Sequence, residues 1–128
     1  SSTRAVLRFS MPKARWQCEM VVNLKGNATI TLSNDNGEKV VMLYDAKAET
    51  FSMDRTKSGK MDFSNDFAAT TQAPTYGKIS QLRLFIDKSS IEVFDAEGKM
   101  AMTNLVFPTK PYNKVTVKGG KYQVYNIK

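Results

Sequence analysis

Apolar and polar residues alternate along most of this chain with a period of two. This period is typical of a half-buried β-strand, whose successive side chains point to opposite faces. We expect strands at residues 4–9, 16–24, 28–32, 39–44, 50–54, 79–86, 90–94, 100–106, 115–118 and 122–127. The pattern predicts an all-β protein: an antiparallel two-sheet β-sandwich of about ten strands, concanavalin-like or jelly-roll-like in type.

The segments between these ranges are typical of turns and loops. NDNG at residues 34–37 ends in Asn-Gly, a strong signal for a tight turn between two strands. DAKAE at residues 45–49 is too short to form a helix alone, so we expect a turn there and no substantial helix. Residues 55–76 are polar and are expected to form a loop.

Length and composition exclude several classes of protein. The chain has 128 residues, which suits one domain over residues 1–128. Its net charge is +7, but the basic residues are scattered and follow no nucleic-acid-binding motif, so we predict no nucleic-acid partner. No apolar run reaches about 18 residues, so we predict no membrane span. Histidine is absent and Cys18 is the only cysteine, which excludes a Cys/His zinc site; we predict no metal and no cofactor.

The segment LRLFIDKSSIEVF at residues 82–94 has the pattern of a β-hairpin. A turn at residues 88–89 places Ile86 opposite Ile91 and makes one face of the hairpin aliphatic, so we expect that face to join the core.

The other face of the hairpin carries two carboxylates, those of Asp87 and Glu92. The same register puts them roughly 7 Å apart as diagonal neighbours, a separation that resembles the acid and base pair of glycosidases. Two simpler interpretations stay open. Arg83 is also a diagonal neighbour of Glu92 and would form an ion pair with it, and Asp87 would accept hydrogen bonds from the turn.

Several segments of the chain resemble one known family. Residues 82–94 are similar to the L-R-I-F-V-D-R-S-S-V-E-V-F segment in the C-terminal β-sandwich of glycoside hydrolase family 32, the levanases, inulinases and invertases. FSMDRTKSG at residues 51–59 resembles that family's F-x-x-D-R-T-K-S-G element. Ala-Pro at residues 73–74 and LVFP at residues 105–108 fit the family in order and spacing. The resemblance covers residues 44–112.

The resemblance implies a module without the catalytic site. In that family a five-bladed β-propeller precedes the sandwich and carries the motifs W-x-N-D-P-N-G, R-D-P and E-C. None of these motifs occurs in this chain, and NDNG at residues 34–37 lacks the Trp and the Pro. We therefore expect no enzymatic activity from this chain itself, and a parent protein that is a retaining β-fructofuranosidase, levanase or inulinase. The family also implies a secreted, periplasmic or cell-surface location.

Two functions fit a sandwich of this kind. In the first, the module supports the stability, assembly or substrate access of an N-terminal catalytic β-propeller in the same parent chain. In the alternative, it is a carbohydrate-binding module that recognises the terminal fructose of a fructan, with levan, inulin and sucrose as candidate ligands. The side chains predicted to contact the sugar are those of Asp54, Arg55, Tyr76, Asp87, Glu92 and Trp16.

Simpler roles for some of these residues stay open. Asp54 and Arg55 would form a local ion pair at a strand end, and Trp16, the only tryptophan, would pack in the core.

Overall fold

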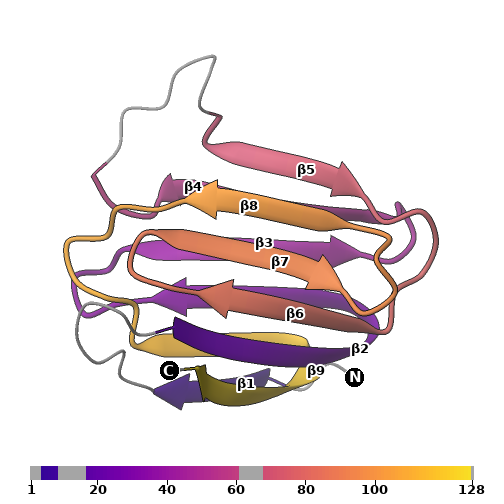
Figure 1. Cartoon of the computed structure of the whole chain (residues 1–128), viewed down its shortest axis with the longest axis horizontal. Coiled ribbons are helices and arrows are strands. Elements are labelled where there is room, and N and C mark those ends of the chain that lie inside the picture. Colours follow the sequence, from indigo (N-terminus) through magenta and orange to yellow (C-terminus); the bar gives the residue numbers. More distant parts are fainter. Residues whose placement is uncertain (1–3, 9–16, 61–67, 128) are drawn as a thin grey trace.

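The structure is a computed structural model that describes residues 4–8, 17–60 and 68–127. The described residues form nine strands, all paired antiparallel. The strands are β1 (Arg4–Arg8), β2 (Gln17–Ser33), β3 (Lys39–Asp45), β4 (Thr50–Lys57), β5 (Thr70–Pro74), β6 (Gln81–Ile86), β7 (Ser90–Asp95), β8 (Ala101–Leu105) and β9 (Lys114–Ile127). They stack in two layers, with β6, β7 and β8 in front of β2, β3 and β4 (Figure 1). The predicted all-β sandwich is confirmed.

The two layers share the long strands β2 and β9. The first half of β2, residues 18–23, pairs with β6 in one layer, and its second half, residues 28–33, pairs with β3 in the other. Strand β9 follows β2 through both halves, with a register shift between Leu24 and Thr29. The sandwich is thus one sheet folded at the β2–β9 pair, in the order β5-β4-β3-β2-β6-β7-β8.

This continuity corrects the sequence-based strand list. The predicted strands at 16–24 and 28–32 belong to the single strand β2, and those at 115–118 and 122–127 belong to β9. The short polar segments at residues 25–27 and 119–121 have the composition of turns, but they lie within β2 and β9, where the β2–β9 pair bends. At that bend Gly119 has φ +89°, and a Cβ atom there would lie 2.1 Å from the Asn27 carbonyl oxygen. Only glycine allows the two backbones to approach so closely.

The predicted loop at residues 55–76 was wrong at both ends. Strand β4 continues to Lys57, and β5 adds an edge strand at Thr70–Pro74. β5 escaped prediction because its sequence, TTQAP, is polar and ends in proline, and it pairs on one side only, with β4. Such a strand lacks the apolar alternation that marks a half-buried one.

The core lies between the layers and is built mainly from the inward-facing residues of β2, β3, β4, β6, β7, β8 and β9. In β6 and β7 the predicted register is confirmed, with Ile86 opposite Ile91 and Leu84 opposite Val93. The predicted turns are confirmed as well: residues 46–49 form a turn, and Gly37 in NDNG has φ +77° and donates to the Asn34 carbonyl oxygen at 3.2 Å.

Arg55 ties the two layers together at the edge opposite the β2–β9 fold. It is 2% exposed, although it carries a charge. Its guanidinium leaves β4 and donates to the carbonyl oxygen of Leu105 in β8, at 2.7 Å, and to that of Ala68. Desolvation lowers the pKa of this guanidinium below its ordinary value. Nearby, the Asn104 side chain of β8 donates to the Thr71 hydroxyl of β5 at 2.9 Å.

The segment after β8 forms hydrogen bonds with residues in or next to the other family-like segments. The Val106 amide donates to the Ser89 carbonyl oxygen in the β6–β7 turn at 2.9 Å. The Lys60 amide donates to the Phe107 carbonyl oxygen at 3.0 Å, and Gly59 lies so near that a Cβ would be 2.2 Å from this same oxygen. The segments at 51–59, 82–94 and 105–108 are therefore one connected structural unit.

Replacing Gly119 by alanine tests the fold at the bend. Gly119→Ala is expected to lower the free energy of unfolding by about 3 kcal/mol, because it adds a backbone clash to an unfavourable φ. Gly37→Ala is the matched control, since Gly37 also has positive φ but nothing within 4 Å of its added Cβ; it should cost about 1 kcal/mol. Urea denaturation of both variants measures the difference. Equal losses would contradict the close approach at the bend.

Replacing Arg55 by methionine tests the tie between the layers. Arg55→Met keeps the length of the side chain but leaves two part-buried carbonyl groups without this donor, so it should cost about 3 kcal/mol. The control is Arg83→Met, since Arg83 is exposed and paired with Glu19 at 3.4 Å; its loss should stay below about 1 kcal/mol. Thermal and urea unfolding give both values. A stable Arg55→Met variant would show that the layers do not depend on this contact.

Candidate functional site

Within the described residues, the side chains predicted to bind sugar do not all gather in one site. Trp16 lies outside the described residues, so the prediction for it stays a prediction. Arg55 is buried, and its guanidinium donates to the main-chain carbonyl groups of Leu105 and Ala68. Alternation along β4 turns Asp54 outward and Arg55 inward, so these two neighbours face opposite sides of the sheet.

Asp87 stands at the tip of the β6–β7 hairpin and orders the turn. Its Oδ1 accepts hydrogen bonds from the amides of Ser89, at 2.8 Å, and Ser90, at 2.7 Å. This contact confirms the interpretation that the carboxylate serves the turn.

Asp87 and Glu92 border the same shallow depression. Its volume is about 200 Å³, and its lining consists of Phe85, Ile86, Asp87, Ser90, Glu92 and Thr103. Glu92 is exposed and accepts a long hydrogen bond, 3.4 Å, from the Thr103 hydroxyl. The structure thus brings together these two members of the predicted set, next to an aromatic ring.

The predicted ion pair between Arg83 and Glu92 was wrong. Arg83 pairs instead with Glu19 of β2, its Nη1 lying 3.4 Å from Glu19 Oε2. Strand β6 has two neighbours, β7 and β2, and Glu19 is the diagonal neighbour on the β2 side. The sequence could not reveal this choice, because the β2–β6 pairing joins segments about sixty residues apart.

An aromatic pair lies on the outer face of the same hairpin. The rings of Phe85 and Phe94 stack with centroids 5.5 Å apart and an interplanar angle of 18°, and both side chains are half-buried. The predicted register placed both on the outer face, but the sequence analysis assigned them no function. Leu105 of β8, 45% exposed, adds an aliphatic side chain to this face.

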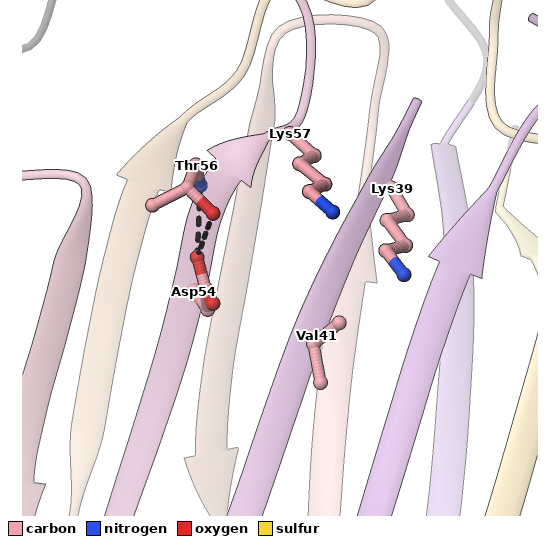
Figure 2. A pocket seen from close by; sticks show the side chains of 5 residues that line it. All are labelled: Lys39, Val41, Asp54, Thr56 and Lys57. Carbon is pink, nitrogen blue, oxygen red and sulfur yellow. Dashed lines mark hydrogen bonds between the residues drawn. The ribbon is translucent and has the colours of Figure 1, made fainter. Parts of the chain in front are cut away.

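Asp54 lies on the outer face of the other layer, in a second shallow pocket. Its volume is about 190 Å³, and Figure 2 shows the five residues that line it, namely Lys39, Val41, Asp54, Thr56 and Lys57. Asp54 Oδ1 accepts from both the amide and the hydroxyl of Thr56, at 2.9 and 2.7 Å. These two bonds, aided by the charges of Lys57 and Lys39, lower the pKa of the Asp54 carboxyl below its ordinary value. Asp54 is therefore a carboxylate at neutral pH.

Tyr76 lies in the connection between β5 and β6 and is 74% exposed. Its φ is +52°, unusual for an aromatic residue. The neighbouring Thr75 holds this turn, since its amide donates to Glu49 O at 2.9 Å and its hydroxyl to Gly77 O at 2.7 Å. Tyr76 precedes β6 and Asp87 follows it, so they occupy opposite ends of that strand (Figure 1). They do not share a site.

Two other kinds of site are absent from the described part of the chain. No three His, Cys, Asp or Glu side chains there lie close enough together to hold a metal ion. The same residues contain no helix that is long and apolar enough to cross a membrane.

Comparison with known proteins identifies the family. The family described as "Glycosyl hydrolases family 32 C terminal" matches residues 3–128. A levanase of Bacillus sp. (strain L7) is 30% identical over 100 residues, which cover 75% of this chain and 11% of the levanase. An extracellular exo-inulinase of Aspergillus niger is 36% identical over 76 residues, covering 56% of this chain and 14% of that protein.

The structural comparison agrees in fold. The crystal structure of an exo-inulinase from Aspergillus awamori superimposes with a TM-score of 0.67 and 21% sequence identity, over 98% of this chain and 28% of that one. The chain thus spans well under a third of these relatives. Because the family match runs over nearly its whole length, the chain belongs to the C-terminal domain family of glycoside hydrolase family 32.

Proposed function

We propose that this chain is the non-catalytic C-terminal sandwich of a fructan- or sucrose-hydrolysing enzyme and that it supports a catalytic β-propeller in the same parent protein. The observation that carries the proposal is family membership over residues 3–128 in a chain that spans only 11% of a levanase. A secreted, periplasmic or cell-surface location belongs to the proposal, because the exo-inulinase relative is described as extracellular.

The contacts of the acidic residues support a non-catalytic role. Asp87 is bonded to the hairpin turn and Asp54 to Thr56, so each carboxylate has a local structural partner. Asp54 and Glu92 lie on the outer faces of different layers and cannot work as a pair. The partners of Asp87 and Asp54 therefore give these two carboxylates a structural role in the sandwich.

A surface suited to the propeller lies on the outer face of β6, β7 and β8. Phe85, Phe94 and Leu105 present apolar area there, and the Arg83–Glu19 pair and Glu92 add polar groups around it. A mixed surface of this composition is typical of contacts between domains of one chain. We propose this face as the one that contacts the propeller.

Hydrolysis assays test the non-catalytic role. The purified chain, incubated with sucrose, inulin or levan, should release no fructose, whereas the full-length protein that carries it should release fructose from at least one of them. Fructose release by the chain itself that disappears in the Glu92→Gln variant would contradict the proposal.

A substitution in the apolar face tests support of the propeller. In the full-length protein, Phe85→Asp should lower the melting temperature of the catalytic domain by several degrees, because it removes apolar contact and adds an unpaired charge at the interface. Ser52→Asp is the control, since Ser52 lies on the outer face of the other layer. The melting temperatures of both variants are also measured in the isolated chain. Any destabilisation of the sandwich itself can then be subtracted from the effect seen in the full-length protein. Equal effects of the two variants would rule out this face as the interface.

The alternative function, recognition of a terminal fructose, is favoured by one observation. The depression at the hairpin tip combines Asp87, Glu92 and the ring of Phe85. Carboxylates that accept hydroxyl hydrogens, next to an apolar ring, are suited to a neutral sugar.

Calorimetric titration of the chain with levan, inulin and fructose tests the alternative. If the depression binds fructose, Glu92→Gln should weaken the affinity about tenfold, while Glu97→Gln, in the turn that follows β7, should leave it unchanged. Absence of heat with all three ligands would leave the supporting role as the only one proposed.

A further inference from the structure

The pocket on the outer face of β3 and β4 carries an inference that goes beyond support of a propeller. We propose that Lys39, Lys57, Thr56 and Asp54 form a site for a small phosphorylated sugar, with the lysines on the phosphate and Asp54 on a sugar hydroxyl. The site would exist whether or not the chain contacts a propeller.

The two lysines form an unusual pair. Lys39 and Lys57 are direct partners in the β3–β4 register, both are exposed, and both line the pocket. Like charges directly opposite each other on neighbouring strands are destabilising. The ion pairs found within the described residues are Arg83–Glu19 and Lys99–Glu97, so neither pocket lysine has an ion pair of its own there. A bound dianion would relieve this repulsion.

A β-bulge creates the arrangement. Lys39 pairs with Lys57 and Val41 with Asp54, so one residue of β3 faces two residues of β4. The extra residue breaks the alternation, and Thr56 and Lys57 both become exposed although they are adjacent. The Lys39 and Lys57 side chains therefore lie side by side with their ammonium groups directed the same way (Figure 2).

A third lysine extends the positive potential. Ser33 of β2 pairs with Lys39 on one side and with Lys114 of β9 on the other. Lys114 is half-buried and its neighbour Val115 is buried. Because side chains alternate along a strand, Lys114 lies on the outer face of β9. Three lysines thus follow one row across the sheet, which attracts an anion toward the pocket.

Asp54 makes the site selective for a sugar phosphate over phosphate alone. Its Oδ1 accepts hydrogen bonds from Thr56, and within the described part of the chain no hydrogen bond reaches its Oδ2. A carboxylate near two lysines repels a free phosphate but accepts a hydrogen bond from a hydroxyl group of a larger ligand. Val41 adds an apolar contact for the carbon side of a sugar ring. The volume of about 190 Å³ is below that of pockets for drug-sized ligands, about 300 to 1,000 Å³. One monosaccharide suits this space better than a polysaccharide.

Titration of the purified chain with fructose 6-phosphate, fructose and inorganic phosphate tests the site. Followed by calorimetry or by NMR shifts of the Thr56 and Lys57 amides, fructose 6-phosphate should bind more tightly than inorganic phosphate, and fructose should not shift these amides. Lys39→Gln and Lys57→Gln should each weaken binding about tenfold, since each removes one charge-assisted bond. Lys118→Gln is the matched control, because Lys118 is exposed on the same sheet in another row; it should change the affinity less than about twofold.

Asp54→Asn tests the proposed sugar contact of Asp54 separately from the phosphate contacts of the lysines. The asparagine oxygen can still accept from Thr56, while the negative charge is lost. Inorganic phosphate should then bind more tightly and the preference for fructose 6-phosphate should shrink. The proposal is overturned if no ligand shifts the Thr56 amide, if the Lys118 variant loses as much affinity as the pocket variants, or if the wild-type chain binds inorganic phosphate as tightly as fructose 6-phosphate.

Discussion

The pairing of β2 with β9 is the constraint on which the other contacts depend. These two strands stay hydrogen-bonded through both layers, and the register shift between Leu24 and Thr29 marks where the pair bends. Strand β1 pairs directly with β9, and the remaining strands join by pairing outward from this pair, through β3 on one side and β6 on the other. If the pair did not bend, the inward faces of β3 and β6 could not meet, and the aliphatic residues of the hairpin would lie in water. The close approach at Gly119 is what makes the bend possible.

The folded sheet still has an open edge, and Arg55 closes it. Its guanidinium reaches from β4 to a carbonyl group of β8, which replaces the strand pairing that the two edges lack. A charged side chain suits this position because it donates several bonds from a fixed planar group to carbonyl oxygens that would otherwise be buried without a donor. In the same region the Lys60 amide donates to the Phe107 carbonyl oxygen, and the Val106 amide donates to the Ser89 carbonyl oxygen. The sequence features that resemble the family therefore meet where the sandwich closes.

The parts of the fold that depend on neighbours in sequence were predictable, and those that depend on distant strands were not. The hairpin register, the NDNG turn and the turn contacts of Asp87 follow from residues a few positions apart, and all three were predicted. The continuity of β2, the partner of Arg83 and the burial of Arg55 depend on pairings between segments far apart in the chain. For the same reason the facing lysines of β3 and β4 were missed, because a bulge shifts the register that alternation alone would give. The separation of the predicted sugar-binding residues could not be foreseen either.

Arg55 is buried between the layers and is not accessible to a ligand. The polar and aromatic side chains that a ligand can reach lie on the outer faces of the two layers. The face of β6 and β7 offers carboxylates and aromatic rings, and the face of β3 and β4 offers lysines beside a carboxylate. A neutral fructan and a phosphorylated sugar differ in charge, so each suits a different face. The core between the layers is filled by apolar side chains, which isolates one face from the other. A ligand on the lysine face can therefore bind while the aromatic face is covered by another domain, and the sandwich can combine a structural role with a binding role without conflict.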